Sequence, residues 1–236
     1  MFYQFQNTIS PIKLSEYDPS VLTLGIISLK ELAECYHLFG FSRETVMTCQ
    51  DVTRKSHGIL DIYDDYHFRI ITAIDTKSLI HLEDRIGIYV KKSLLLIVII
   101  EDQDNSIYTD LTRSLSGLNP AKLTLERLVF RFLEMLIFDN YEILGEIEDR
   151  ISEYEESIED NRLSKDFNRE IVVLRKQLLL LNNYYEQLIY LGEELKGNSI
   201  GIFDENQLRY FKIFNDHVIR LSTHIEKLDT YCIHVR

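Results

Sequence analysis

The sequence contains little cysteine, proline and glycine, and each shortage excludes a class of protein. Its three cysteines, Cys35, Cys49 and Cys232, lie far apart and form no C-x-x-C pair. A zinc knuckle or a disulfide framework is therefore not indicated, and a reducing compartment fits. Only three prolines and nine glycines occur, while 45% of the residues are apolar and 27% are charged. This composition is typical of a folded, soluble chain and not of a disordered one.

Long apolar runs are missing as well. The most apolar run, Leu94–Ile100, contains seven residues. A membrane-spanning helix needs about 20. The first residues, Met1 to Gln6, lack the basic region and the apolar core of a secretory signal. We therefore expect that the chain as given does not cross a membrane.

Positive charge is scarce relative to negative charge. The chain has 38 acidic and 26 basic residues, so its formal net charge is -12. This balance argues against a nucleic acid as partner, because binding to a phosphate backbone needs clustered lysine and arginine. It is compatible with the attraction of cations, although an excess of one charge is often explained by solubility alone.

Catalytic motifs are also missing. The sequence has no phosphate-binding glycine loop, no G-x-S-x-G and no H-E-x-x-H. A metal-dependent hydrolase would need carboxylates that converge on one point, whereas the acidic residues here are expected on exposed helix faces. We therefore expect no enzymatic activity.

Residues 1–118 predict a small α/β domain. Ser28 and Glu31 have the spacing of a capping box, so a helix should begin at Leu29. The run Leu94–Ile100 is too short for a helix with an exposed face and predicts a central strand buried on both sides. Other strands are expected at 21–27, 59–63, 66–74 and 79–90, and other short helices at 42–50 and 104–115.

The second half predicts three long amphipathic helices. Asn119 as N-cap and Pro120 at the first helical position mark its start. Apolar residues recur at steps of three and four, the spacing of coiled-coil packing. The helices are expected at 120–160, 164–197 and 204–236; the first two form an antiparallel hairpin (119–200) and the third a stalk (201–236). The expected fold class is thus α/β (α+β), with a long helical hairpin and a stalk helix after the small domain.

Charge along the hairpin is one-sided. Nine acidic residues from Glu142 to Asp160 are accompanied by one basic residue, Arg150. Such a run is typical of a solvated face, or of one that meets cations or a basic partner. On the third helix, His217 and His224 lie seven residues apart on one face. This spacing favours a structural role, because metal ligation from one helix typically needs a spacing of three or four and further ligands.

Besides the order of these parts, four stretches are distinctive: Tyr63–Phe68, Leu128–Ile151, Leu174–Leu178 and Tyr210–Leu221. The last of them contains a Tyr-Phe pair and an Asp-His pair on the third long helix. In these features the chain resembles the cytoplasmic part of the CorA family of divalent-cation channels. The resemblance extends over most of the chain from about residue 20, and the two pairs are its most distinctive part.

The resemblance implies a domain that senses intracellular Mg²⁺, or Co²⁺ and Ni²⁺, and couples it to the gating of a pore. It implies a homopentamer in which Mg²⁺ binds between neighbouring cytoplasmic domains and holds the channel closed. The full-length protein would be an integral membrane protein, with this soluble part at the cytoplasmic face of the cell membrane. Its pore, with a Gly-Met-Asn loop, would follow Arg236, where the apolar repeat of the last helix is still open.

The expected regulatory metal site departs from the family pattern. The family pairs an aspartate of the α/β domain with one on the stalk, shortly after the Tyr-Phe pair. Ile213 occupies that stalk position and cannot ligate Mg²⁺, so Asp216 is the nearest carboxylate. In the α/β domain the partner falls between Thr48 and Asp51, where Asp51 is the only acid. We therefore predict Asp51 and Asp216 as the ligands of a regulatory Mg²⁺.

Two other functions compete with this one. A soluble coiled-coil adaptor would explain the long helices equally well and would form a complex that is indifferent to Mg²⁺. A zinc-exporting relative of the same family would share the fold. The gene beyond the codon of Arg236 separates the adaptor from the channel. A channel needs two apolar segments of about 20 residues with Gly-Met-Asn between them, whereas a stop codon would contradict it.

Overall fold

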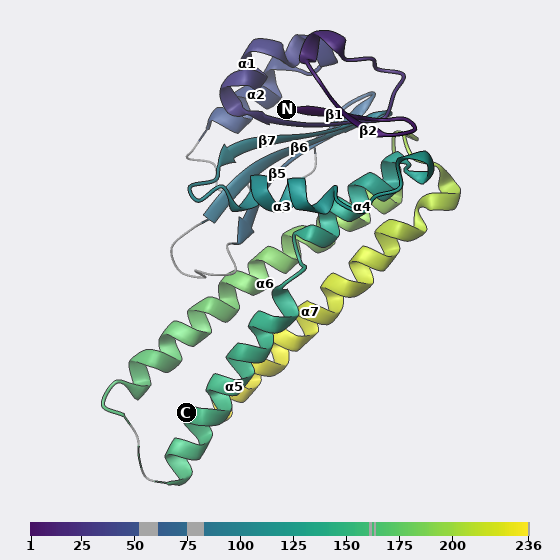
Figure 1. Cartoon of the computed structure of the whole chain (residues 1–236). Coiled ribbons are helices and arrows are strands. Elements are labelled where there is room, and N and C mark those ends of the chain that lie inside the picture. Colours follow the sequence, from purple (N-terminus) through teal and green to yellow (C-terminus); the bar gives the residue numbers. More distant parts are fainter. Residues whose placement is uncertain (52–60, 75–82, 161, 163, 236) are drawn as a thin grey trace.

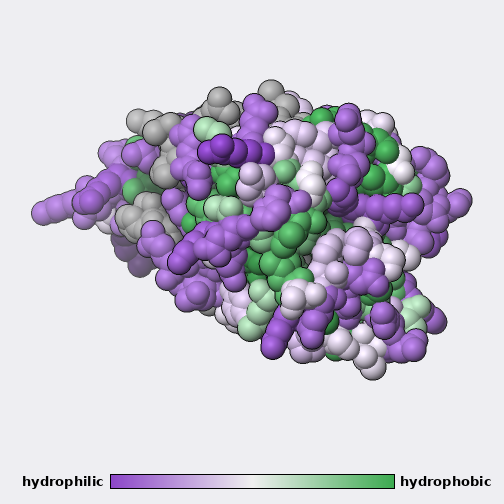
Figure 2. Space-filling model, turned by 90° about the horizontal axis from the view of Figure 1, so that it is seen from above, coloured by the Kyte–Doolittle hydropathy of each residue, from purple (hydrophilic) through white to green (hydrophobic). Residues whose placement is uncertain are grey.

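The structure, a computed structural model, describes residues 1–51, 61–74, 83–160, 162 and 164–235. A mixed β-sheet forms one end of the molecule, and long helices extend from it as a bundle (Figure 1). Two short helices cover one face of the sheet, and the bundle begins on the other. Seen from above, the surface is largely hydrophilic and has an apolar area near its centre (Figure 2).

The sheet has seven strands among the described residues, in the order β2-β1-β3-β7-β6-β5-β4. Its one parallel pair in this part of the chain is β3 with β7. Strand β7 lies in the middle, and its residues Leu94–Val98 are fully buried, which confirms the predicted central strand. The strands are β1 (Phe2–Phe5), β2 (Ile9–Ile12), β3 (Thr23–Ser28), β4 (Asp61–Ile62), β5 (Tyr66–Ile74), β6 (Glu83–Lys91) and β7 (Leu94–Glu101).

The sequence pattern does not predict β1 and β2. Each has four residues, too few for a clear apolar alternation, and β2 is an edge strand that contains Pro11. Strand β1 pairs with β3 and places Phe2 opposite Gly25, where the phenyl ring covers the glycine. The first parts of the strands predicted at 59–63 and 79–90 lie outside the described residues.

Helices α1 (Leu29–Cys35) and α2 (Arg43–Gln50) begin at the predicted caps. The Ser28 hydroxyl accepts a hydrogen bond from the Glu31 backbone N–H (3.3 Å), and the Glu31 carboxylate accepts one from the Ser28 backbone N–H (2.7 Å). This arrangement is the capping box, which satisfies two N–H groups that a helix start leaves free. Ser42 caps α2 in the simpler way, through its hydroxyl alone.

The sheet separates two hydrophobic cores. Successive side chains of a strand point to opposite faces. Leu94, Leu96 and Val98 of β7 accordingly pack with α1 and α2, whereas Leu95 and Ile97 belong to the second core. This second core continues from the sheet into the bundle without interruption. Its helices are α3 (Ser106–Ser114), α4 (Leu125–Met135), α5 (Asn140–Glu159), α6 (Phe167–Gly197) and α7 (Arg209–His234).

The prediction of one continuous helix over 120–160 is wrong, because the chain is interrupted between α4 and α5. The Asn140 side chain donates a hydrogen bond to the Leu136 carbonyl (3.1 Å), and the Tyr184 hydroxyl of α6 donates another to the same carbonyl (2.8 Å). In a continuous helix the Leu136 carbonyl would accept a backbone N–H from four residues further on; here the two side chains occupy it instead. The first long helix therefore bends where it meets α6.

Helix α7 packs against α4, α5 and α6. Helices α5 and α6 run antiparallel, as predicted for the hairpin (Figure 1). The two helices do not form a separate two-helix unit, because α7 packs against both of them. An ion pair between Arg175 and Asp229 (3.1 Å) joins α6 to α7. No helix in the described part of the chain combines the length and the apolarity that a membrane span requires.

Candidate functional site

The two predicted Mg²⁺ ligands lie on different parts of the chain. Asp51 follows α2, is half-buried, and accepts a hydrogen bond at its backbone carbonyl from Arg85 Nη2 (3.4 Å). Asp216 is exposed on α7, and its carboxylate makes no hydrogen bond or ion pair in the described part of the chain. Because α2 and α7 belong to the cores on opposite faces of the sheet, one chain does not bring the two carboxylates together.

A row of polar contacts ties α7 to α4 and α5. Its three α7 residues are seven positions apart, so they lie on one face of the helix. The two histidines thus have the structural contacts that their spacing favours. A shift of α7 along its axis would break all the contacts of the row together. The three contacts of this row are His217 Nδ1 with Glu134 (3.0 Å), His224 Nε2 with Glu148 (3.3 Å), and the Tyr231 hydroxyl with Glu155.

Three aspartates form a cluster that could hold a metal ion. Oxygens of Asp84, Asp102 and Asp104 lie within 4.8 Å of one another, and Asp84 is 2% exposed. The cluster surrounds the start of α3. Asp104 accepts the backbone N–H of Ser106 (2.9 Å), Asp102 accepts that of Tyr108 (3.2 Å), and the Ser106 hydroxyl donates to Asp84 (3.2 Å). Carboxylates are stabilised by the free N–H groups of a helix start, so the cluster also has a structural role.

The sequence does not group these aspartates, because a β-bulge decides their neighbours. The bulge lies between Arg85 and Ile86 and shifts the pairing of β6 with β7 by one residue. Without it, Asp84 would be placed opposite Glu101. With it, Asp84 lies next to Asp102. The Asp-x-Asp pair after a predicted strand is the signal that the sequence offers.

Comparison with protein families decides the identity of the chain at family level. A family model described as CorA-like Mg²⁺ transporter protein matches residues 28–230. This chain belongs to the CorA family. The match confirms the resemblance carried by Leu128–Ile151 and Tyr210–Leu221, and it includes both the sheet and the bundle. A comparison with curated protein sequences gave no match.

Solved structures share the fold of this CorA-family chain. The soluble domain of CorA from Methanocaldococcus jannaschii matches with a TM-score of 0.74 and 17% identity, over 100% of this chain and 94% of that one. The complete CorA magnesium transporter from the same organism matches with a TM-score of 0.80 and 15% identity, over 99% of this chain and 74% of that one. The ZntB cytoplasmic domain from Vibrio parahaemolyticus RIMD 2210633 matches with a TM-score of 0.76 and 12% identity, over 99% of this chain and 93% of that one. These likenesses confirm the predicted fold class, with its hairpin and stalk helix.

The CorA-family chain also buries two polar side chains where β5 meets α6. Neither ring nitrogen of His67 has a hydrogen-bond partner in the described part of the chain, and the ring stacks on Phe203 with centres 6.1 Å apart. Arg69, next on the same face, donates Nη2 to the Gln187 carbonyl (3.1 Å). Burial lowers the pKa of the His67 imidazole to about 4 and that of the Arg69 guanidinium to about 10. His67 is therefore neutral in the folded protein near pH 7.

Acidification is expected to weaken the fold through His67. Unfolded His67 takes up a proton near its ordinary pKa of 6.5, whereas folded His67 does so only near 4. The unfolded state thus binds more protons between these values, and the free energy of unfolding falls as the pH drops through this window. From pH 7 to pH 5 we expect a loss of about 2 kcal/mol from this group. Urea unfolding at both pH values measures it.

The matched variants are His67→Leu, which removes the buried imidazole, and His37→Gln, which removes an exposed one. The pH dependence between 7 and 5 should be flatter in His67→Leu and unchanged in His37→Gln. Equal pH dependence in all three proteins would show that His67 is not the responsible group.

Proposed function

We propose that this chain is the cytoplasmic regulatory domain of a CorA-like divalent-cation channel for Mg²⁺, or for Co²⁺ and Ni²⁺. It senses intracellular metal and transmits that state to the pore through α7. The full-length protein would be an integral membrane protein with this domain on the cytoplasmic side. The observation that carries the proposal is a family match that extends to residue 230, within the last turns of α7. The row of contacts from α7 to α4 and α5 supports the transmission.

In this proposal the regulatory Mg²⁺ binds between two copies of the chain. Asp216 of one copy would hold it together with Asp51 of a neighbour, because one copy does not bring them together. Asp216 fits such an ion, since its carboxylate is exposed and has no partner in the described part of the chain. Mg²⁺ keeps several waters and is usually bound by only one or two carboxylates. Ile213 offers no ligand oxygen, so the α7 contribution falls on Asp216.

Self-association is supported by the exposed side of α7. Ile213, Ile219 and Ile233 are 40%, 45% and 53% exposed there, although α7 buries an apolar stripe in the bundle. Apolar residues on the same side as a free carboxylate suit a contact with a second copy. We propose that the copies form a homopentamer, and that the mutual repulsion of chains with a net charge of -12 makes this assembly depend on a bridging dication.

Removal of the Asp216 carboxylate is expected to weaken the Mg²⁺-dependent association of the chain. In sedimentation velocity, millimolar Mg²⁺ should shift the wild type to a larger species. Asp216→Asn should need about tenfold more Mg²⁺, a loss of about 1.4 kcal/mol. The control is Glu226→Gln, which removes another exposed carboxylate from α7 and should behave as the wild type.

Two outcomes would contradict the proposal. If Asp216→Asn and the wild type respond equally to Mg²⁺, Asp216 is not a ligand. If the wild type forms one stable complex with and without Mg²⁺, the chain behaves as the coiled-coil adaptor. The fold match with ZntB makes Zn²⁺ the second ion to test. A response to Zn²⁺ at lower concentration than to Mg²⁺ would favour the zinc-exporting relative.

A further inference from the structure

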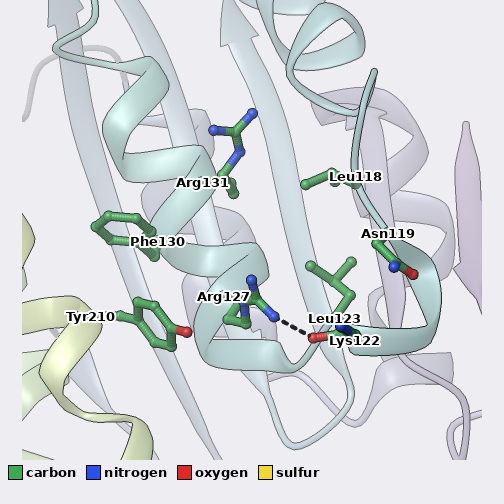
Figure 3. A pocket seen from close by; sticks show the side chains of 8 residues that line it. All are labelled: Leu118, Asn119, Lys122, Leu123, Arg127, Phe130, Arg131 and Tyr210. Atoms are coloured by element: carbon green, nitrogen blue, oxygen red, sulfur yellow. Dashed lines mark hydrogen bonds between the residues drawn. The ribbon is translucent and has the colours of Figure 1, made fainter.

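A small cavity lies where the start of α4 meets the first turn of α7 (Figure 3). Its volume is about 150 Å³. Arg127, Arg131 and Lys122 provide positive charge around it, and Phe130 and Tyr210 form an aromatic side with ring centres 5.4 Å apart. The remaining wall is the loop that precedes α4, so the cavity is lined by one continuous stretch, 118–131, and by Tyr210 of α7.

Positive charge gathers here in a chain whose net charge is -12. Besides the three cations that line the cavity, Arg209 lies against Tyr210, with its guanidinium carbon 5.4 Å from the ring centre. None of these four cations pairs with a carboxylate in the part of the chain that the structure describes. Five basic side chains elsewhere in the described residues have such partners, whereas others on exposed helix faces, such as Lys212 and Arg220, have none; what sets the four apart is that they gather at one cavity.

Two of the cations lie on the same aromatic ring. The Arg127 guanidinium carbon is 5.9 Å from the centre of the Tyr210 ring, on which Arg209 also lies. The ring stabilises each guanidinium, but two like charges near one ring repel each other. Arg127 also donates a hydrogen bond to the Lys122 carbonyl (2.8 Å), which holds it at the cavity. The arrangement therefore presents fixed positive charge that an anion would neutralise.

We propose that this cavity binds a phosphate group of a small molecule, with Arg127, Arg131 and Lys122 as its ligands. Guanidinium groups bind phosphate through paired hydrogen bonds. Three cations suit an anion with two or more charges better than they suit a single carboxylate. The aromatic side gives the group that carries the phosphate an apolar surface on which to pack. Such a ligand would join α4 to the first turn of α7.

This inference does not rest on the proposed function, because the cavity contains neither Asp51 nor Asp216. Calorimetric titration of the chain with inorganic phosphate, pyrophosphate and ATP tests it, at low salt and with EDTA present so that no dication contributes. We expect pyrophosphate or ATP to bind with one site per chain. Affinity should fall steeply with added salt, since the contacts are between charges at the surface.

The decisive variants are Arg131→Gln and the double variant Arg127→Gln/Arg131→Gln. Arg131 is exposed and makes no hydrogen bond in the described residues, so its replacement tests binding with little effect on the fold. Each lost guanidinium should weaken binding by about tenfold. The control is Arg113→Gln, because Arg113 is an exposed arginine of α3 that pairs with Asp110 (3.2 Å) and does not line the cavity. Thermal melting of every variant shows whether it is folded.

The outcomes distinguish a nucleotide from free phosphates as the ligand, and both from an acidic segment of a second copy. Tighter binding of ATP than of pyrophosphate, with the difference lost in Tyr210→Leu, identifies a nucleotide. Equal binding identifies free phosphates. The proposal is overturned if no probe binds the wild type, or if folded Arg131→Gln and the double variant bind as the wild type does. It is also overturned if the double variant changes the sedimentation of the ligand-free chain, because the cavity then receives an acidic segment of a second copy.

Discussion

Leu178→Asp is expected to lower the free energy of unfolding by at least about 4 kcal/mol, or to prevent folding. Leu178 is 1% exposed in the middle of α6 and belongs to the core that α6 shares with α5 and α7. The substitution removes a buried isobutyl group and places a carboxylate where no water reaches it. Urea unfolding followed by circular dichroism measures the loss.

The neighbouring residue provides the control. Leu179 is 60% exposed on the same helix, so Leu179→Asp makes the same chemical change one position on, in contact with water. We expect its effect to stay within about 0.5 kcal/mol. If the two variants lost equal stability, the apolar stripe of α6 would not be the face that holds the bundle together.

Gly192→Ala is expected to cost about 3 kcal/mol, because Gly192 of α6 packs directly against Asn215 and Phe214 of α7. A β-carbon at this position would lie 1.9 Å from Asn215 Oδ1 and 3.2 Å from Phe214 Cδ1. Asn215 is 2% exposed, and its side-chain amide donates a hydrogen bond to Glu193, so it has little room to move away. The two helices would have to separate. Thermal and urea unfolding of the variant measure this cost.

Gly145→Ala is the matched substitution. Gly145 lies within α5, and apart from its neighbours in the same helix no atom of the described residues lies within 4 Å of the position that a β-carbon would take. Alanine favours a helix over glycine by about 0.5–1 kcal/mol, so this variant should be more stable than the wild type. A stabilising effect of both substitutions would contradict the close helix approach at Gly192.

Local chemistry explains what could be predicted. The Ser28–Glu31 capping box, the cap at Ser42 and the buried strand β7 involve residues that are close in sequence, so composition and spacing suffice to identify them. The apolar stripes of α6 and α7 likewise repeat within each helix. The stretch Tyr210–Leu221 combines such a stripe with distinctive polar pairs, which is why it carries the family resemblance.

Long-range contacts explain what could not be predicted. The interruption between α4 and α5 depends on the Leu136 carbonyl, which accepts hydrogen bonds from Asn140 and from Tyr184 of another helix. No residue near Leu136 in the sequence predicts that Tyr184 will contact it. The position of α7 between α5 and α6 is decided in the same way, by which apolar stripes meet when the chain folds.

The candidate sites likewise have some features that the local sequence decides and others that long-range contacts decide. The sequence by itself determined that Ile213 offers no ligand and that Asp216 is the nearest carboxylate on the stalk helix. Only the tertiary structure placed Asp51 on the opposite face of the sheet, so that a shared ion would need a second copy. Only the tertiary structure gathered the aspartates near α3 and brought Arg209 and Tyr210 of α7 to the cations at the start of α4. The physical reason is that helix and strand periods act over a few residues, whereas a site is assembled by strand register and helix packing between distant segments.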